Sequence, residues 1–571
     1  MSLLINVFQM KKKQIASLFI GMSAVLGAIL FTMFIIPKSE PGNQLIMGLS
    51  VIRVFIGIFF LGLLLINVGA ILFITVNLGS WQKEFERKVI GYFLDHQAVV
   101  MIGLYGVFIL TGAFLLLIIP PIIRPLTFLQ PVSTRLGGFL GWIFLASLLL
   151  IVLLRLLAAE MKINEPVVAR LDEILILVGL FLVVFVLYAH FAALIGWINK
   201  TKYSFWDLLA GQFLQGKLYL TNPPYTHDLT LYEGNWYVPM PPLPAILMMP
   251  LAYLIGAENI STSYLSMVFS AINGVLVFLI LRQINDRQWI QISKRGIFLL
   301  VIIFLFGTPH LWVGISGRGW YVSQILTVLF LALATYSALR SWPAWLIGTF
   351  IAIAMIARPN SLMTWPFVFA ISMQILKENQ GKIDLKHVFH WSIETVPPIV
   401  IAVIGLLTYN YLRFENVLDF GYTTVNAGPD IVKNVQTWGV FSPHFILNNL
   451  KVMFFRMPRI NLSSQWPLEP STTGMSVFLT TPPLIYLFHR YPKQWWIIGA
   501  WVAVLFNITL LSFYHNTGAH QFGYRYILDM LVPLITMLAV GLGRKIPWHF
   551  IVLVLASIII NMYGADWFMN G

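Results

Sequence analysis

Long apolar runs follow one another along almost the whole chain, with short polar turns between them. The runs lie at about residues 14–36, 46–77, 98–122, 137–159, 173–198, 262–282, 296–314, 320–340, 343–357, 360–376, 393–413, 475–489, 494–513, 523–542 and 548–565. A helix that spans a bilayer needs about 20 mostly apolar residues. The pattern therefore predicts an all-α polytopic membrane protein with about 15 transmembrane helices.

Two features interrupt this pattern. The short runs 343–357 and 360–376 meet at Arg358-Pro359-Asn360, which is a helix break, and broken helices at membrane depth are tolerated where they line a protein-enclosed or wet cavity. The short run 242–256 is interrupted by Pro244 and Pro250. We expect this run to form a helix in the outer interface, because counting it as a span would reverse every later loop.

The positions of lysine and arginine predict the orientation. Turns such as those at 83–88, 282–295, 377–386 and 544–545 carry clusters of positive residues, whereas Lys38, Arg318 and Arg525 stand alone in the alternate turns. Cytoplasmic loops carry the excess of positive residues. The chain is expected to cross the cell membrane many times with a cytoplasmic N-terminus and with two long outer loops, at about 199–261 and 414–474. A division near residue 172 separates a four-helix module (1–171) from a core (172–571) that carries both loops.

Composition excludes several classes of protein. The chain is 58% hydrophobic and 10% charged, with a mean hydropathy of +0.82, so it is not a water-soluble domain. The net charge of +14 comes from short clusters between apolar runs, and we expect no nucleic-acid partner. There is no cysteine, which excludes disulfides and thiolate metal sites. His515 and His520 have no acidic residue nearby, so neither a metal site nor a cofactor is predicted, and a divalent metal has no support.

The most polar passage runs from Thr221 to Pro244 in the first long loop. Turn signals at 222–224 and 233–235 predict a short hairpin with one arm at 226–231 and the other at 236–238. His227 and Asp228 lie on the first arm, and a histidine beside a carboxylate fits general base chemistry. The alternative is that Asp228 caps a turn.

Few other carboxylates are expected on the outer side. They are Glu40, Asp207, Glu233, Glu258, Glu415, Asp419, Asp430, Glu469 and Asp566, with Asp529 just inside the membrane. Asp207 is the second candidate acid or base, in the amphipathic stretch 206–214. It equally fits the first turn of an interfacial helix, where an acidic residue suits the helix dipole.

Three single arginines fall at outer ends of helices, namely Arg318, Arg358 and Arg525. Arginine binds phosphate oxygens bidentately, so three guanidinium groups around one outer cavity would suit a phosphate or pyrophosphate. The alternative is that each extends to the lipid headgroups. The side chains expected to contact a sugar or an acceptor are Glu233, Trp236, Tyr237, Trp320, His520 and Tyr524.

The order of these segments resembles a known family. The stretch 208–220, the hairpin, Pro241-Pro242-Leu243-Pro244, the segments 357–359 and 411–422, and Gly523-Tyr524-Arg525-Tyr526 are similar to those of GT-C superfamily membrane glycosyltransferases. The nearest likeness is to bacterial relatives of the protein O-mannosyltransferases and the aminoarabinose transferases. The resemblance covers about 172–571 and consists of an arrangement with short motifs.

The resemblance implies a polyprenyl-phosphate-linked sugar as donor, a glycan, lipid or protein as acceptor, and inverting transfer at the outer face with a loop aspartate as acid or base. The family acid usually follows the first core helix directly, where this chain has Asn199 and Lys200. The role is then expected to fall to Asp228 or Asp207. The alternatives are a transporter or flippase for a lipid-linked saccharide, and a non-catalytic protein of the same fold.

Overall fold

The computed structural model describes residues 97–118, 166–197, 203–462, 467–518 and 520–570, with isolated positions at 45–68 and 143–151. The chain separates into two compact units, residues 1–103 and 104–571. Of the elements named below, β1, β2 and the beginning of α4 belong to the first unit, and the rest of the account concerns the second. The boundary expected near residue 172 stays a prediction.

The described part of the chain is mostly helical. Its α-helices are α4 (Gln97–Ile118), α6 (Pro166–Leu194), α7 (Trp206–Phe213), α8 (Leu243–Ile255), α9 (Thr262–Asp286), α10 (Lys294–Phe306), α11 (His310–Ser316), α12 (Gly319–Leu339), α13 (Ala344–Ala357), α14 (Trp365–Gln380), α15 (Leu385–Phe414), α16 (Pro429–Trp438), α17 (Ile446–Phe454), α18 (Val477–Thr480), α19 (Trp495–Ser512), α20 (Leu531–Leu542) and α21 (Trp548–Asn570). Short 3₁₀ helices are η2 (Ala257–Asn259), η3 (Pro359–Thr364), η4 (Pro443–Phe445), η5 (Pro482–Leu487) and η6 (Arg525–Met530). The strands form three two-stranded hairpins: β1 (Leu45–Ile46) with β2 (Leu49–Ser50), β3 (Thr230–Tyr232) with β4 (Asn235–Tyr237), and β5 (Arg459–Ile460) with β6 (Leu468–Glu469).

The helical class expected from the sequence is confirmed. Within the described residues, seven helices are long and apolar enough to cross a membrane, or eight if the bent pair α10 and α11 is one span. The expected helix at 343–357 is present as the short α13. The expected spans at 14–36, 46–77 and 137–159 lie largely outside the described residues, so the total of about 15 stays a prediction.

One expected span differs in structure. The run 475–489 folds as α18 and η5, separated at Thr481, and not as one continuous helix. Pro482 and Pro483 explain the break, because proline lacks the N–H of a helical hydrogen bond and disfavours a helical residue before it.

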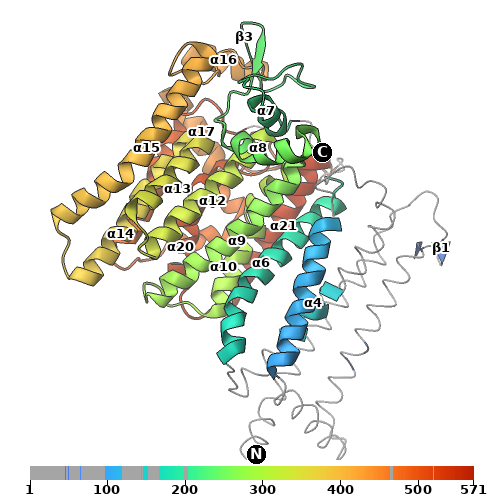
Figure 1. Cartoon of the computed structure of the whole chain (residues 1–571), viewed down its shortest axis with the longest axis vertical. Coiled ribbons are helices and arrows are strands. Elements are labelled where there is room, and N and C mark those ends of the chain that lie inside the picture. The colour runs from blue at the N-terminus through green and yellow to red at the C-terminus, as the bar shows by residue number, and fades with distance from the viewer. Residues whose placement is uncertain are drawn as a thin grey trace, which may run out of the picture. The chain divides into compact units, whose positions relative to one another are not determined.

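Helix α12 lies at the centre of the core helices (Figure 1). Its membrane-length segment is 83% buried, compared with 22% for the peripheral α15. It packs against α9 on one side and α13 on the other, and α13 packs in turn against α15. The central position of α12 matters for function, because its first turns contribute to the cavity described below.

The bent pair α10 and α11 turns by 52° at Gly307–Pro309. The break leaves backbone carbonyls without helical partners, and side chains from distant parts of the sequence donate hydrogen bonds to them. The Tyr188 hydroxyl donates to the Leu305 carbonyl at 2.6 Å, and the Ser557 hydroxyl donates to the Gly307 carbonyl at 2.5 Å. Such bonds are what permit a broken helix away from water.

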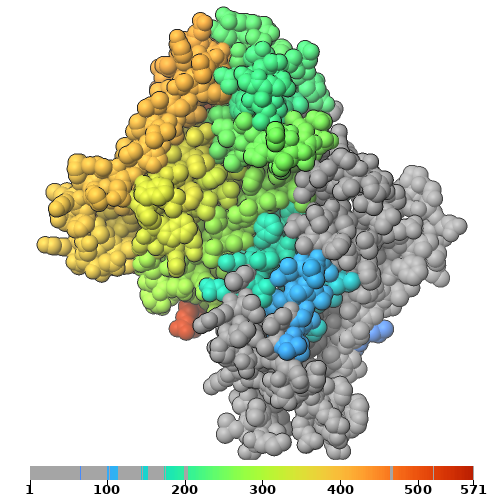
Figure 2. Space-filling view, in the orientation of Figure 1, coloured from blue at the N-terminus to red at the C-terminus, as the bar shows by residue number. Residues whose placement is uncertain are grey.

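The two long loops meet at one end of the bundle. The expected hairpin forms as β3 and β4, with Glu233 and Gly234 in its tight turn at positive φ. Its first arm begins at Thr230, so His227 and Asp228 lie in a turn before the strand and not on the arm as expected. Thr230 forms a bridge with Val425 of the second loop. Figures 1 and 2 show the hairpin segment beside the segment around α16 at this end. Helix α8 forms as expected at 243–255, and its placement in the membrane interface stays a prediction.

Helices α13 and α15 approach so closely that a glycine is required between them. A Cβ atom added at Gly348 would lie 2.2 Å from the Thr395 carbonyl oxygen, whereas one added at Gly405 of α15 would meet nothing within 4 Å. Gly348→Ala should therefore destabilise the protein by about 1–3 kcal/mol, the usual range for overpacking. Gly405→Ala should be neutral or slightly stabilising, because alanine is the better helix former. Thermal unfolding of the purified full chain in detergent measures both, and equal shifts would contradict the close packing.

Candidate functional site

A cavity of about 600 Å³ lies where the first turns of α12, the break between α13 and α14, and the two long loops converge. Its wall mixes apolar and polar side chains. The lining residues are Met240, Pro241, Trp320, Ser323, Ala357, Arg358, Pro359, Asn360, Met363, Asn416, Leu418, Asp419, Phe420, Tyr422, Thr423, Val440, Phe441, Leu510, Leu511, Tyr514 and Tyr526. A volume in this range suits a small-molecule ligand.

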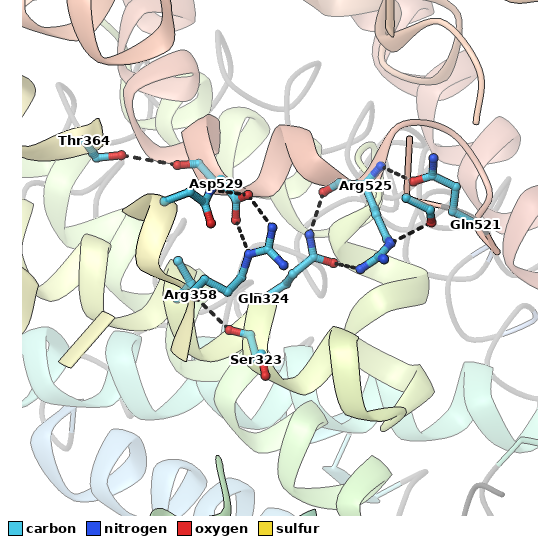
Figure 3. Close-up of polar contacts among 10 residues, drawn as sticks. Ser323, Gln324, Arg358, Thr364, Gln521, Arg525 and Asp529 are labelled. Carbon is cyan, nitrogen blue, oxygen red and sulfur yellow. Dashed lines mark hydrogen bonds and ion pairs between the residues drawn. The ribbon is translucent and has the colours of Figure 1, made fainter. Parts of the chain in front are cut away.

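The helix break presents an ion pair to this cavity. Arg358 follows the last residue of α13, and its Nε and Nη2 donate to the two carboxylate oxygens of Asp529 at 3.0 and 2.9 Å (Figure 3). Asn360 donates to the same carboxylate at 2.8 Å. Asp529 is fully buried, whereas 13% of the Arg358 side chain is exposed. Arg358 thus lies at the cavity as expected, with its charge compensated from behind.

Arg525 lies next to this pair but does not line the cavity (Figure 3). Its side chain donates to the Gly518 carbonyl at 3.0 Å and to Gln324 Oε1 at 2.9 Å. Within the described residues it has no carboxylate partner, although it is only 3% exposed. The ring of Tyr526, which lines the cavity, contacts both guanidinium groups, with Arg525 Cζ 4.8 Å and Arg358 Cζ 5.1 Å from the ring centroid.

Arg318 is the third predicted phosphate ligand, and it also lies outside the cavity lining. It occupies the N-cap of α12, where its Cζ lies 4.9 Å from the ring centroid of Phe568, 5.1 Å from that of Trp197 and 5.8 Å from that of Tyr203. The structure therefore does not bring three free guanidinium groups to one cavity. Arg358 is the one arginine among the lining residues of this cavity.

Asp228 lies behind the wall of the cavity, at the start of the hairpin. The indole N–H of Trp320, which lines the cavity, donates to Asp228 Oδ2 at 3.2 Å. The main-chain N–H of Asp228 donates to the Asn426 carbonyl at 2.8 Å, and its φ of 65° lies in the left-handed region that aspartate tolerates. The nearest oxygen of Asp228 is 3.7 Å from His227 Nε2, which is too long for a hydrogen bond.

Asp207, the second predicted acid or base, is buried and stabilises the beginning of a helix. It lies fully buried in the first turn of α7 and accepts a hydrogen bond from the Ser204 hydroxyl at 2.9 Å. It is absent from the cavity lining. This placement matches the alternative considered above, in which the carboxylate supports the beginning of a helix.

Most of the residues expected to contact a sugar lie elsewhere. Glu233 is exposed in the hairpin turn, and Trp236 and Tyr237 belong to β4, where the Tyr237 ring packs against Phe414 at 5.3 Å. Tyr524 is buried, and its hydroxyl has no hydrogen-bond partner among the residues that the structure describes. Of this group of predicted residues, the structure places only Trp320 in the wall of the cavity.

His520 lies beside the Arg318 cluster. Its main-chain carbonyl accepts a hydrogen bond from the Tyr321 hydroxyl at 2.6 Å, and its ring lies 5.2 Å from that of Phe568. Burial, together with the positive charge of Arg318, lowers the pKa of His520. No group of three or more His, Asp or Glu residues in the described part of the chain could hold a metal.

The structure adds functional candidates that sequence reasoning did not select. Asp419 lines the cavity, and one of its carboxylate oxygens accepts a hydrogen bond from the Gly421 N–H at 2.7 Å. Tyr422 stacks on Trp320 with ring centroids 6.3 Å apart, and burial raises its pKa to about 12. Asp419 was one of the few carboxylates expected on the outer side, and that scarcity was the available signal for it.

Comparison of the chain with protein-family models, with curated proteins and with solved structures gives no match. The function of the cavity has to be argued from its own side chains.

The burial difference within the ion pair leads to a prediction about stability. Removing one member of a buried pair typically costs about 3–5 kcal/mol, because the other charge is left uncompensated. Arg358→Gln leaves the fully buried Asp529 charged, so we expect a loss in this range. Asp529→Asn should cost less, because Arg358 reaches the cavity and its water. Thermal unfolding of both variants in detergent, with exposed Asp430→Asn as control, checks the order, and a smaller loss for Arg358→Gln would refute it.

Proposed function

We propose that this protein is a membrane glycosyltransferase that moves a sugar from a polyprenyl-phosphate donor to an acceptor hydroxyl, with inversion. The observation that supports this proposal best is the contact between Asp228 and Trp320. It places a partly exposed carboxylate directly behind an indole in the wall of a cavity of about 600 Å³. Carboxylates act as general bases when they lie within reach of the proton that they accept.

The cavity has the composition that a lipid-linked sugar requires. Leu418 and Phe441 line it and are themselves 75% and 55% exposed, so the cavity offers accessible apolar surface to a lipid chain. The polar part holds Arg358 and Asn360. Arg525, behind the lining, adds a second positive charge beside the Arg358–Asp529 pair, so the positive charge available to a phosphate lies on the Arg358 side, whereas Asp419 makes its own part of the lining negative.

The proposed reaction is a single displacement. The acceptor oxygen forms a bond to the anomeric carbon from the face opposite the phosphate, and its proton passes to the Asp228 carboxylate. The bond between the anomeric carbon and the phosphate oxygen breaks, and its electron pair stays on the leaving phosphate. Arg358 and Asn360 are the groups placed to stabilise that charge. Trp320 holds Asp228 in place through its indole N–H.

Asp228→Asn should lower sugar transfer by about 10²–10⁴-fold, the usual contribution of a general base, with little effect on donor binding. The assay supplies a labelled polyprenyl-phosphate sugar and candidate acceptors to the full chain in lipid nanodiscs. Asp430→Asn is the matched control, because the carboxylate of Asp430 is exposed in the first turn of α16 and lies outside the cavity lining.

The variant Asp419→Asn tests which of the two carboxylates, Asp228 or Asp419, is the general base. Full activity of Asp228→Asn together with loss in Asp419→Asn would move the base to Asp419. Failure of the wild-type chain to bind any lipid-linked sugar would overturn the glycosyltransferase proposal. Movement of the donor across a vesicle bilayer without sugar transfer would replace that proposal with a flippase.

A further inference from the structure

A second recess lies at the other end of the helix bundle. It has a volume of about 530 Å³ and is lined by Ser293, Lys294, Arg295, Arg544 and Ile546. The two ends of helix α12 show that the recess and the first cavity lie at opposite ends of the bundle. Its first turns reach the cavity described above, whereas the carbonyl of its last residue, Leu339, accepts a hydrogen bond from Arg287, seven residues before Lys294.

The recess is strongly positive. Three of its five lining residues are cations, and they come from two separate segments, the start of α10 and the turn between α20 and α21. All three are exposed, and none forms an ion pair with any residue that the structure describes. Lys294 and Arg295 also lie in the first turn of α10, which has no acidic residue, so the positive end of the helix dipole adds to their charge.

Two other arginines at this end have carboxylates nearby. Arg282 pairs with Glu173 and Asp286, and Arg287 lies 3.9 Å from Glu378. These three carboxylates therefore pair with other cations, and the exposed charges of Lys294, Arg295 and Arg544 are left to attract an anion.

The surface next to the recess is apolar. Helices α10 and α21 are in contact, and both begin at the recess. Phe298 is exposed one turn into α10, and Ile551, Leu555 and Ile559 form an exposed stripe along α21. Trp548, at the first residue of α21, is 75% exposed, as expected for an aromatic residue at the level of the headgroups.

We propose that this recess binds an anionic phospholipid, with its phosphodiester headgroup between Lys294, Arg295 and Arg544 and its acyl chains along the apolar stripes of α10 and α21. Basic pockets at the ends of membrane helices recognise anionic headgroups in this way. The apolar stripes are what distinguish a lipid from a free phosphate as the occupant. The proposal is independent of sugar transfer, because no residue of the recess belongs to the first cavity.

The test measures lipid binding by the full chain. Short-chain phosphatidylglycerol is titrated into the detergent-solubilised protein, and native mass spectrometry counts the bound lipids. A triple variant with Lys294→Gln, Arg295→Gln and Arg544→Gln should bind roughly 100-fold more weakly, at about fivefold for each cation removed near a lipid headgroup. The single variant Arg544→Gln, which leaves α10 unchanged, should lose about fivefold.

The matched control carries Lys377→Gln, Lys382→Gln and Lys386→Gln. These are three exposed cations outside the recess, and their removal changes the net charge by the same amount. The control should bind phosphatidylglycerol as the wild type does. Equal weakening in the control and the recess variant would overturn the proposal, because net charge alone would then explain binding.

Two further ligands separate the possible sources of the anion. Phosphatidylcholine, which is zwitterionic, should bind far more weakly than phosphatidylglycerol, and equal binding would refute recognition of an anion. Glycerol phosphate offers the charge without acyl chains. If it competes as effectively as the short-chain lipid, the recess is a site for a soluble anion and the lipid proposal is wrong.

Discussion

The break between α13 and α14 depends on the ion pair between Arg358 and Asp529. An arginine at membrane depth costs about 2.5–3.5 kcal/mol on insertion scales, and a buried carboxylate without a partner is at least as unfavourable. The bidentate contact resolves both problems at once. Asn360 and Thr364 add hydrogen bonds from η3 to the same aspartate, so the contact joins one broken helix to another, η3–α14 to η6–α20. The cavity exists because these two breaks meet.

The same constraint explains other irregular segments of the core. Where a helix stops away from water, side chains from distant parts of the chain bind the exposed backbone. Ser557 of α21 donates to the carbonyl of Gly307, directly after α10. Asn561 of α21 donates to the carbonyl of Thr480, the last residue of α18. Helix α21 therefore stabilises two breaks at once. Short or broken apolar runs in the sequence are sites where tertiary structure must supply such donors.

Local features of the fold could be predicted from the sequence, and partners could not. Apolar length predicts α9, α12 and α15, and turn residues predict the β3–β4 hairpin, because each depends on neighbouring residues. The sequence also marks Arg358 as unusual. Nothing local indicates that its partner is Asp529, 171 positions later, or that Asp207 is fully buried, although the Ser204 hydroxyl that binds Asp207 lies only three positions before it. The prediction of three phosphate-binding arginines treated each as isolated, whereas in the fold Arg525 is held by Gln324 and Gly518.

Asp228 shows how far the candidate site depends on long-range contacts. Its loop is held by the second long loop, through Asn426 and Gly421, and by α12, through Trp320. Two of these partners lie directly next to the cavity, since Trp320 lines it and stacks on Tyr422, beside Gly421. Trp320 therefore contacts both Tyr422 in the cavity lining and the carboxylate of Asp228 behind it. The position of Asp228 beside the cavity thus depends on residues about 90 and 200 positions later in the chain, which an isolated polar loop could not provide.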